Sequence, residues 1–166
     1  MNKALFNLSQ TCRTLLQENP GPEGRKLIAA HLQDLLTDAE TTKDLVPFTA
    51  GERDLLYQDP ELGFCILAHN YADPKTTSPH DHGPSWAIYA QVRGETEMRE
   101  YDLVQEASEN TPGKVKVNKT YQMRPGDAYV YDEGVLHAPT RTTPTSLLRI
   151  EGTDMSKVKR LRYELN

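Results

Sequence analysis

Short runs of alternating apolar and polar residues, separated by turn residues, make up most of the chain from about residue 45 onward. Asp59-Pro60, Gly94 and Pro112-Gly113 are typical turn residues between such runs. No helical pattern lies between successive runs, as parallel βαβ units would require. The chain therefore predicts an all-β barrel built from strands at 54–58, 63–70, 86–93, 96–105, 114–121, 126–131, 135–141 and 146–151.

The first 44 residues have a different, helical periodicity. A first amphipathic helix is predicted over residues 3–18, and the sequence Asn19-Pro20-Gly21-Pro22 ends it. Pro22 suits the first position of a second helix, because its missing N–H has no helical partner there. We expect residues 1–44 to form a helical extension packed on a barrel of residues 45–166, as one domain overall. The apolar stripes are Leu5, Leu8, Cys12, Leu15 and Leu16, then Leu27, Ile28, Leu32, Leu35 and Leu36.

Composition excludes several classes of partner. The chain has 166 residues and a net charge of -5, which argues against nucleic acid or an anionic membrane surface as a partner. No apolar run approaches the length of a membrane span, and the first residues lack the apolar core of a signal peptide. The two cysteines, Cys12 and Cys65, do not form a disulfide framework. We therefore expect a cytoplasmic protein.

Three histidines are candidate metal ligands. His80 and His82 are two residues apart, so on an extended strand their imidazoles point to the same face and can share one cation. His137 closes a second segment that begins at Gly126. Three neutral imidazoles suit a first-row divalent metal and leave coordination positions open for a substrate. The alternative is that these are ordinary strand histidines without a metal.

The two histidine segments resemble the two signature motifs of the cupin superfamily. The first family motif is His-x-His, three or four residues, Glu, six residues, Gly; here Ala87 stands at the glutamate position and Gly94 closes the motif. The second is Gly, five residues, Pro-x-Gly, two residues, His; here Asp132 replaces the proline, and Gly126, Gly134 and His137 match. The resemblance implies a double-stranded β-helix, which is a small jelly-roll barrel.

A three-histidine site without the glutamate is similar to the thiol dioxygenase branch of the cupins, and so is the helical extension. This similarity implies Fe(II) as the metal and oxidation of a small thiol carboxylic acid by dioxygen to a sulfinic acid. Nickel, zinc or manganese also suit such ligands. The family's serine–histidine–tyrosine relay is incomplete, because Leu148 and Ile150 follow Ser146 at the corresponding positions. Two alternatives stay open: an oxygenase of another chelating molecule, such as a diketone, or a non-catalytic ligand-binding cupin.

Four further residues are candidates for contact with a small-molecule substrate. Arg53 resembles the arginine that pairs with the substrate carboxylate in thiol dioxygenases, since a guanidinium binds a carboxylate through two hydrogen bonds. Tyr89 and Gln91 share the strand parity of Ala87 and are expected to face the cavity, with Arg53 and Tyr89 as the catalytic candidates. Trp86, of opposite parity, is a further candidate contact. A homodimer remains open.

Overall fold

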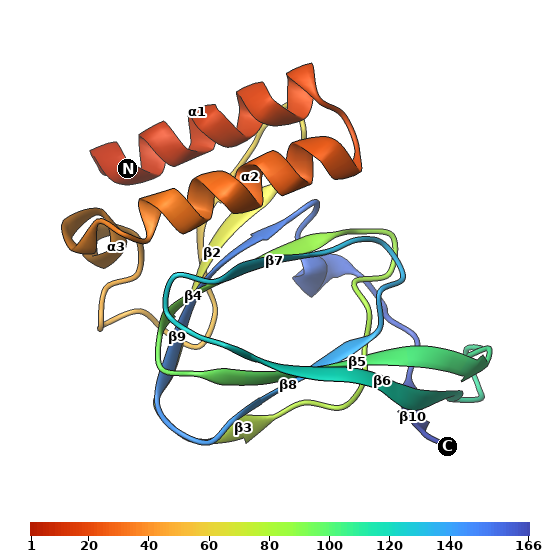
Figure 1. Cartoon of the computed structure of the whole chain (residues 1–166). Helices are drawn as coiled ribbons and strands as arrows, with labels where there is room; N and C mark the ends of the chain where they lie inside the picture. Colours follow the sequence, from red (N-terminus) through yellow and green to blue (C-terminus); the bar gives the residue numbers. More distant parts are fainter.

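The computed structural model describes residues 1–166, and it consists of three α-helices packed on a barrel of two five-stranded sheets (Figure 1). The helices are α1 (Lys3–Glu18), α2 (Pro22–Leu35) and α3 (Ala39–Leu45). The strands are β1 (Asp54–Gln58), β2 (Cys65–Tyr71), β3 (Lys75–Thr76), β4 (Ala87–Arg93), β5 (Thr96–Gln105), β6 (Gly113–Met123), β7 (Ala128–Tyr131), β8 (His137–Arg141), β9 (Thr145–Glu151) and β10 (Tyr163–Leu165). The sheets have the orders β1-β2-β9-β4-β7 and β10-β6-β5-β8-β3, an arrangement that fits the expected cupin barrel.

The helical extension was predicted with two helices, and the structure adds a third. The side chain of Asn2 caps α1 by accepting a hydrogen bond from the Leu5 N–H, and Pro22 opens α2 as expected. Asp38 caps the short α3 in the same way through the Glu40 N–H. The chain is therefore not purely all-β: it is a β-barrel with a helical layer. None of its helices is both long and apolar enough to cross a membrane.

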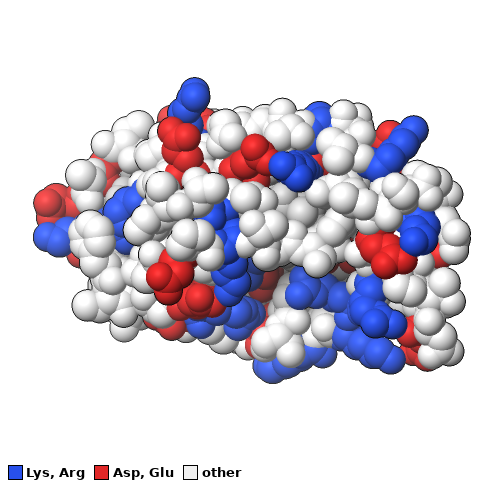
Figure 2. Space-filling model, turned by 90° about the horizontal axis from the view of Figure 1, so that it is seen from below, with Lys and Arg blue, Asp and Glu red and all other residues white.

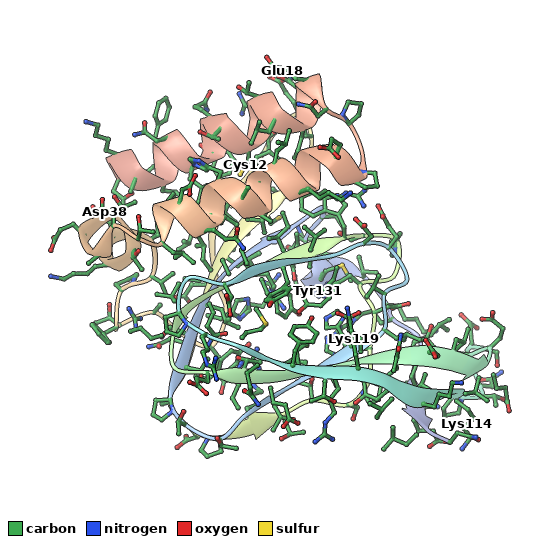
Figure 3. All side chains as sticks on the ribbon, in the orientation of Figure 1. Cys12, Glu18, Asp38, Lys114, Lys119 and Tyr131 are labelled. Atoms are coloured by element: carbon green, nitrogen blue, oxygen red, sulfur yellow. The ribbon has the colours of Figure 1, made fainter.

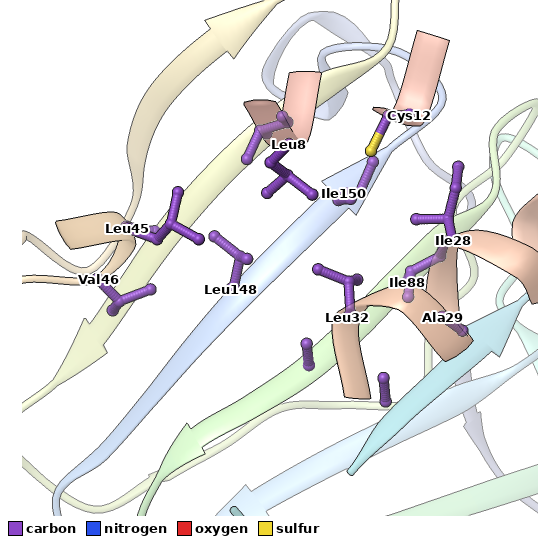
Figure 4. Packing of buried hydrophobic residues seen from close by; sticks show 14 of the residues in the cluster. Leu8, Cys12, Ile28, Ala29, Leu32, Leu45, Val46, Ile88, Leu148 and Ile150 are labelled. Atoms are coloured by element: carbon purple, nitrogen blue, oxygen red, sulfur yellow. The ribbon is translucent and has the colours of Figure 1, made fainter. Parts of the chain in front are cut away.

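The main hydrophobic core lies between the helices and the outer face of the first sheet (Figures 1 and 4). Even-numbered residues of β4 point outward into this core, and residues from β9 join them. Each fully buried leucine or isoleucine contributes about 1.5–3 kcal/mol of hydrophobic free energy. This layer therefore fixes the helices to the barrel through Leu8, Cys12, Ile28, Leu32, Ile88, Leu148 and Ile150.

A second, smaller cluster lies inside the barrel, between the two sheets. It contains Ala87 and Tyr89 of β4 and Tyr131 of β7 with two methionines, and Figure 3 places Tyr131 between the sheets. The alternation of β4 sends residues 87 and 89 inward and residues 88 and 90 outward, as its sequence parity predicts. The barrel interior is aromatic and polar, and the histidines lie there.

Two glycines of the recognised motifs have conformations that other residues rarely adopt. Gly94 has φ +67°, and a Cβ atom there would lie 2.3 Å from the carbonyl oxygen of Pro144. Gly134 has φ +76° in the turn just before His137. These positions close the strand after Tyr89 and direct the chain into β8, so the motif spacing reflects the backbone path that carries the histidines.

Candidate metal centre

Backbone pairing brings His80 and His137 together. The N–H of each donates to the carbonyl oxygen of the other, at 3.0 and 2.9 Å. His82 follows in a turn, where its carbonyl oxygen accepts a hydrogen bond from the Ser85 N–H at 2.9 Å. One ring nitrogen from each histidine lies within 4.8 Å of the others. The structure therefore gathers the three predicted ligands into one group that can hold a single divalent ion.

Hydrogen bonds to the backbone fix the tautomers of two of these histidines. Nδ1 of His80 lies 2.9 Å from the carbonyl oxygen of Ser78, and Nδ1 of His137 lies 2.9 Å from that of Val135. A carbonyl oxygen only accepts, so each Nδ1 carries the proton and each Nε2 keeps a free lone pair. The Nε2 of His137 is buried and has no hydrogen-bond partner. This arrangement is typical of metal-ligating histidines.

His82 also keeps an unsatisfied nitrogen. Its Nε2 lies 3.2 Å from the hydroxyl of Tyr89, while its Nδ1 is buried without a partner. Buried polar atoms are nearly always paired in native proteins. An ion bound by the group would therefore satisfy nitrogens that the protein itself leaves unpaired.

The three imidazoles are held in their neutral form. Burial lowers the pKa of His80 to about 4 and that of His137 to about 3, and it lowers the pKa of His82 still further. Repulsion from neighbouring imidazoles adds to the effect of burial on the pKa values of His82 and His137. Metal binding requires unprotonated nitrogens, so the site is in its metal-binding form at neutral pH.

No carboxylate replaces the glutamate of the family motif. Ala87 is fully buried in the inner cluster, and the two glutamates that follow Gly94 form ion pairs elsewhere: Glu95 with Arg124 and Glu97 with Arg99. The protein therefore offers three nitrogen ligands to an ion and leaves further coordination positions for a substrate.

A cavity of about 760 Å³ opens beside these histidines. Its wall includes His80, and next to it Tyr89 and Tyr71. The other prominent residues of the wall are four arginines: Arg141, Arg149, Arg160 and Arg162. A hollow so rich in guanidinium groups is suited to an anionic ligand.

Tyr89 lies between the histidines and one of these arginines. Tyr89 on β4 and Arg149 on β9 are direct cross-strand partners, and Nη1 of Arg149 donates to the Tyr89 hydroxyl at 3.1 Å. Nη2 of Arg149 forms an ion pair with Glu151 at 3.0 Å. The hydroxyl of Tyr89 is thus held at the edge of the histidine group.

Arg53 lies apart from the cavity, contrary to its expected contact with the substrate. Its guanidinium pairs with Asp154 at 2.8 Å and with Glu151 at 3.4 Å, and it does not line the cavity. Arg53 precedes β1, the outermost strand of its sheet, and two carboxylates already balance its charge. It reaches the site only indirectly, because Glu151 in turn pairs with Arg149.

Trp86 and Gln91 do not line the cavity either. Trp86 belongs to the outer core, where the guanidinium of Arg25 lies 5.3 Å from its ring. Gln91 is buried, and its amide donates to the carbonyl oxygens of Arg93 and Gly94. Trp86 has the parity of the outer-face residues, so its side chain packs in the outer core. Gln91 has the inner parity but lies near the end of β4, where its hydrogen bonds stabilise the turn at Gly94.

The stretch compared with the serine–histidine–tyrosine relay faces away from the histidines. Leu148 and Ile150 pack in the outer core, and the Ser146 hydroxyl donates to Asn70. Residues of the other parity on β9, including Arg149 and Glu151, belong to the site instead. The positions compared with the relay histidine and tyrosine therefore lie on the outer face of this strand.

Arg141 and Arg149 are the site residues that sequence reasoning missed. Arg141 follows His137 by four residues on β8, so the two residues share a strand face. The same parity rule that paired His80 with His82 would have found Arg141. Arg149 requires the pairing of β4 with β9, which only the fold supplies.

The departure from the second motif at Asp132 has a structural role. Arg25 of α2 forms ion pairs with Asp132 at 2.7 Å and with Glu133 at 2.5 Å. These contacts connect the helical layer to the turn that precedes His137. Where the motif has a rigid proline, this chain has a carboxylate that a helix holds in place.

Among known proteins, the chain is similar only to solved structures. No protein-family model matches the chain, and no curated protein sequence matches it. A cupin superfamily protein from Desulfitobacterium hafniense is 16% identical, with 61% of this chain and 76% of that chain covered and a TM-score of 0.44. KdgF from Halomonas sp. is 19% identical, with coverages of 60% and 75% and a TM-score of 0.43. A cupin-2 domain containing protein from Shewanella frigidimarina is 11% identical, with coverages of 72% and 96% and a TM-score of 0.44.

Proposed function

We propose that this chain is a metal-dependent oxygenase that uses Fe(II) to convert a small thiol carboxylic acid to a sulfinic acid. The observation that carries the proposal is the convergence of His80, His82 and His137, as neutral imidazoles with unpaired nitrogens, on the edge of an arginine-lined cavity. Three nitrogen ligands and no carboxylate leave room for a thiolate and for dioxygen at one ion.

Iron(II) at these nitrogens would supply the redox chemistry by which dioxygen oxidises a thiolate. The reaction balances without a further reductant: a thiolate and one dioxygen molecule give one sulfinate, with both oxygen atoms on sulfur. Sulfur is oxidised and dioxygen is reduced in the same step sequence. The chain therefore needs no electron-donating partner for this activity.

Tyr89 and Arg149 position the substrate in this proposal. The Tyr89 hydroxyl accepts a hydrogen bond from Arg149, so its own proton is free to be donated toward the histidine group or a ligand beside it. Arg149 brings a positive charge to the same place, and Glu151 holds its guanidinium in a fixed direction. These residues take over the role that the sequence assigned to Arg53.

The proposal is tested by oxygen uptake. The protein is purified anaerobically, loaded with Fe(II) and mixed with a panel of small thiols with and without a carboxylate. We expect one dioxygen consumed per sulfinate formed, measured with an oxygen electrode and by mass spectrometry. The His82→Ala variant should consume none. Iron-loaded protein that binds thiols without taking up dioxygen would contradict the proposal and favour a ligand-binding cupin.

A further inference from the structure

Arg141 is a buried cation that the protein does not neutralise. It is 2% exposed, lines the cavity, and forms no hydrogen bond or ion pair through its side chain. Its guanidinium lies over an aromatic ring instead, 4.4 Å from the centre of the Tyr71 ring. Arg25, the other buried arginine of the chain, has two carboxylate partners.

An unpaired buried charge is costly, and contact with an aromatic ring offsets only part of that cost. Burial lowers the pKa of Arg141, and the nearby positive charge of Arg149 lowers it further. Both effects disfavour the guanidinium cation in the absence of a ligand. An anion in the cavity would supply the missing partner, and it would bind through parallel hydrogen bonds in water-poor surroundings.

Two more arginines without partners lie at the exposed side of the same cavity. Arg160 and Arg162 form no ion pair and no side-chain hydrogen bond. The only carboxylate of the cavity wall, Glu164, is already paired with Lys114 at 2.6 Å. Figure 2 shows that Lys and Arg side chains gather in patches on one face of the molecule, although the chain is acidic overall.

We propose that the cavity binds a ligand with two anionic groups, one held by Arg141 inside and the other by Arg160 and Arg162 at the opening. The ligand is thus a dicarboxylate or a compound that carries a carboxylate and a phosphate or phosphonate. This inference rests on the proposed function in one respect: the substrate of the oxygenase is then a dianionic thiol, larger than a simple thiol monoacid. The anion site itself exists with or without that activity.

Binding to metal-free protein tests the anion site independently of any turnover. Isothermal titration compares succinate, phosphonoacetate and propionate as probes of a dicarboxylate, a phosphonate–carboxylate pair and a single carboxylate. We expect succinate or phosphonoacetate to bind the wild-type protein at least about tenfold more tightly than propionate, and the stronger of the two identifies the second anionic group. Equal affinity for propionate and both dianions would overturn the two-group proposal.

Matched variants assign the two ends of the ligand. Arg141→Met should weaken binding of the preferred dianion by about 10- to 100-fold, the range expected for loss of hydrogen bonds between charged groups. Arg141→Lys should recover part of that loss. The Arg160→Gln/Arg162→Gln variant, changed only at exposed positions, should weaken the dianion much more than propionate.

The control is Arg124→Met, which removes one positive charge at a site that is not part of the cavity. It should bind as the wild-type protein does. A thermal melt confirms that each variant is folded. Wild-type affinity in folded Arg141→Met would overturn the assignment of Arg141. That result would leave the proposed thiol oxidation untouched. Conversely, a protein that binds dianions but takes up no oxygen would contradict the proposed oxygenase function and not the anion site.

Discussion

Five of the nine buried side-chain atoms that lack a hydrogen bond belong to residues in or beside the candidate site. His82, His137, Arg141, Arg149 and Glu151 each keep a buried side-chain atom without a hydrogen bond. Native proteins pair nearly all such atoms, and a small domain tolerates only a few exceptions. Two of these residues, Arg141 and Arg149, line the cavity, and two, His82 and His137, belong to the histidine group beside it. This is the pattern expected of a site that a metal ion and an anionic ligand complete.

The Tyr89 hydroxyl is the residue-scale test of the proposed chemistry. Tyr89→Phe removes the group that lies between His82 and Arg149 but keeps the aromatic ring that packs in the inner cluster. We expect kcat for thiol oxidation to fall by about 100-fold, the scale of a positioned proton donor, with metal content unchanged. Tyr129→Phe, at an exposed position on the neighbouring strand, is the matched control. Equal losses of kcat in both variants would contradict a specific role for Tyr89.

Replacing Arg141 is predicted to stabilise the ligand-free protein. Its replacement by methionine removes a buried charge that has no partner, so we expect Arg141→Met to raise the free energy of unfolding of ligand-free protein by about 1 kcal/mol or more. The measurement is chemical denaturation without added anions. A residue retained for structure would behave differently: its loss would lower the free energy of unfolding.

At the scale of elements, short polar contacts attach the helical layer to the barrel. Arg25 connects α2 to the turn before His137, and Arg13 connects α1 to Asp59 after β1 at 2.8 Å. Both contacts lie beside the apolar core rather than within it. They add polar connections between the helices and the barrel, while hydrophobic burial supplies most of the free energy of this packing.

The Asp59 contact predicts how stability depends on pH. Burial by itself would raise the pKa of Asp59, but hydrogen bonds from the Leu62 N–H, the Arg13 side chain and the Glu61 N–H more than offset this, so the pKa is lowered. A carboxyl group with a lowered folded-state pKa stabilises the fold above its unfolded pKa of about 3.9, and the contribution disappears as pH falls through the folded-state value.

We therefore expect Asp59→Asn to lower the free energy of unfolding at pH 7 by about 1.5–3 kcal/mol, the usual contribution of a hydrogen bond to a charged group. The difference from the wild-type protein should shrink as the pH is lowered below about 4. Urea denaturation at pH 7 and at pH 3 checks this. A difference that stays constant between the two pH values would show that the Asp59 charge contributes nothing.

Much of this element-scale arrangement could be predicted from the sequence, because it depends on local patterns. Helical spacing located α1 and α2, and strand alternation assigned the two faces of β4. The motif glycines located the turns beside His137 and after Tyr89. These features depend on backbone conformation and on the burial of one face, which neighbouring residues determine.

What could not be predicted depends on contacts between distant segments. Arg53 was placed in the site by its position before the metal strand, but its charge is balanced by Glu151 and Asp154, about a hundred residues later. Leu148 and Ile150, the positions compared with the relay, lie on the outer face of β9, whereas Arg149 lies on the inner face, which is one residue out of step. A sequence pattern can identify two metal-ligating histidines on one strand, but it cannot show which charged residues from other strands lie beside them in the fold.

On the scale of the whole molecule, the residues that stabilise the fold and the residues of the candidate site lie in two separate interiors. The outer core between helices and sheet is apolar and supplies stability, whereas the barrel interior contains histidines, tyrosines and arginines. Strands β4 and β9 contribute to both, one face each. The barrel can therefore contain unpaired polar groups because a separate apolar layer stabilises it.

Metal stoichiometry tests the central claim most directly. The protein is incubated with a small molar excess of Fe(II) under anaerobic conditions and dialysed against metal-free buffer, and bound metal is measured per chain for the wild type and for His80→Ala, His82→Ala and His137→Ala. His69→Ala is the matched control, since His69 is also buried but lies outside the three-histidine group. We predict one ion per chain in the wild type and the control, and less than about a tenth in the other three. Full metal content in folded His137→Ala would contradict the account.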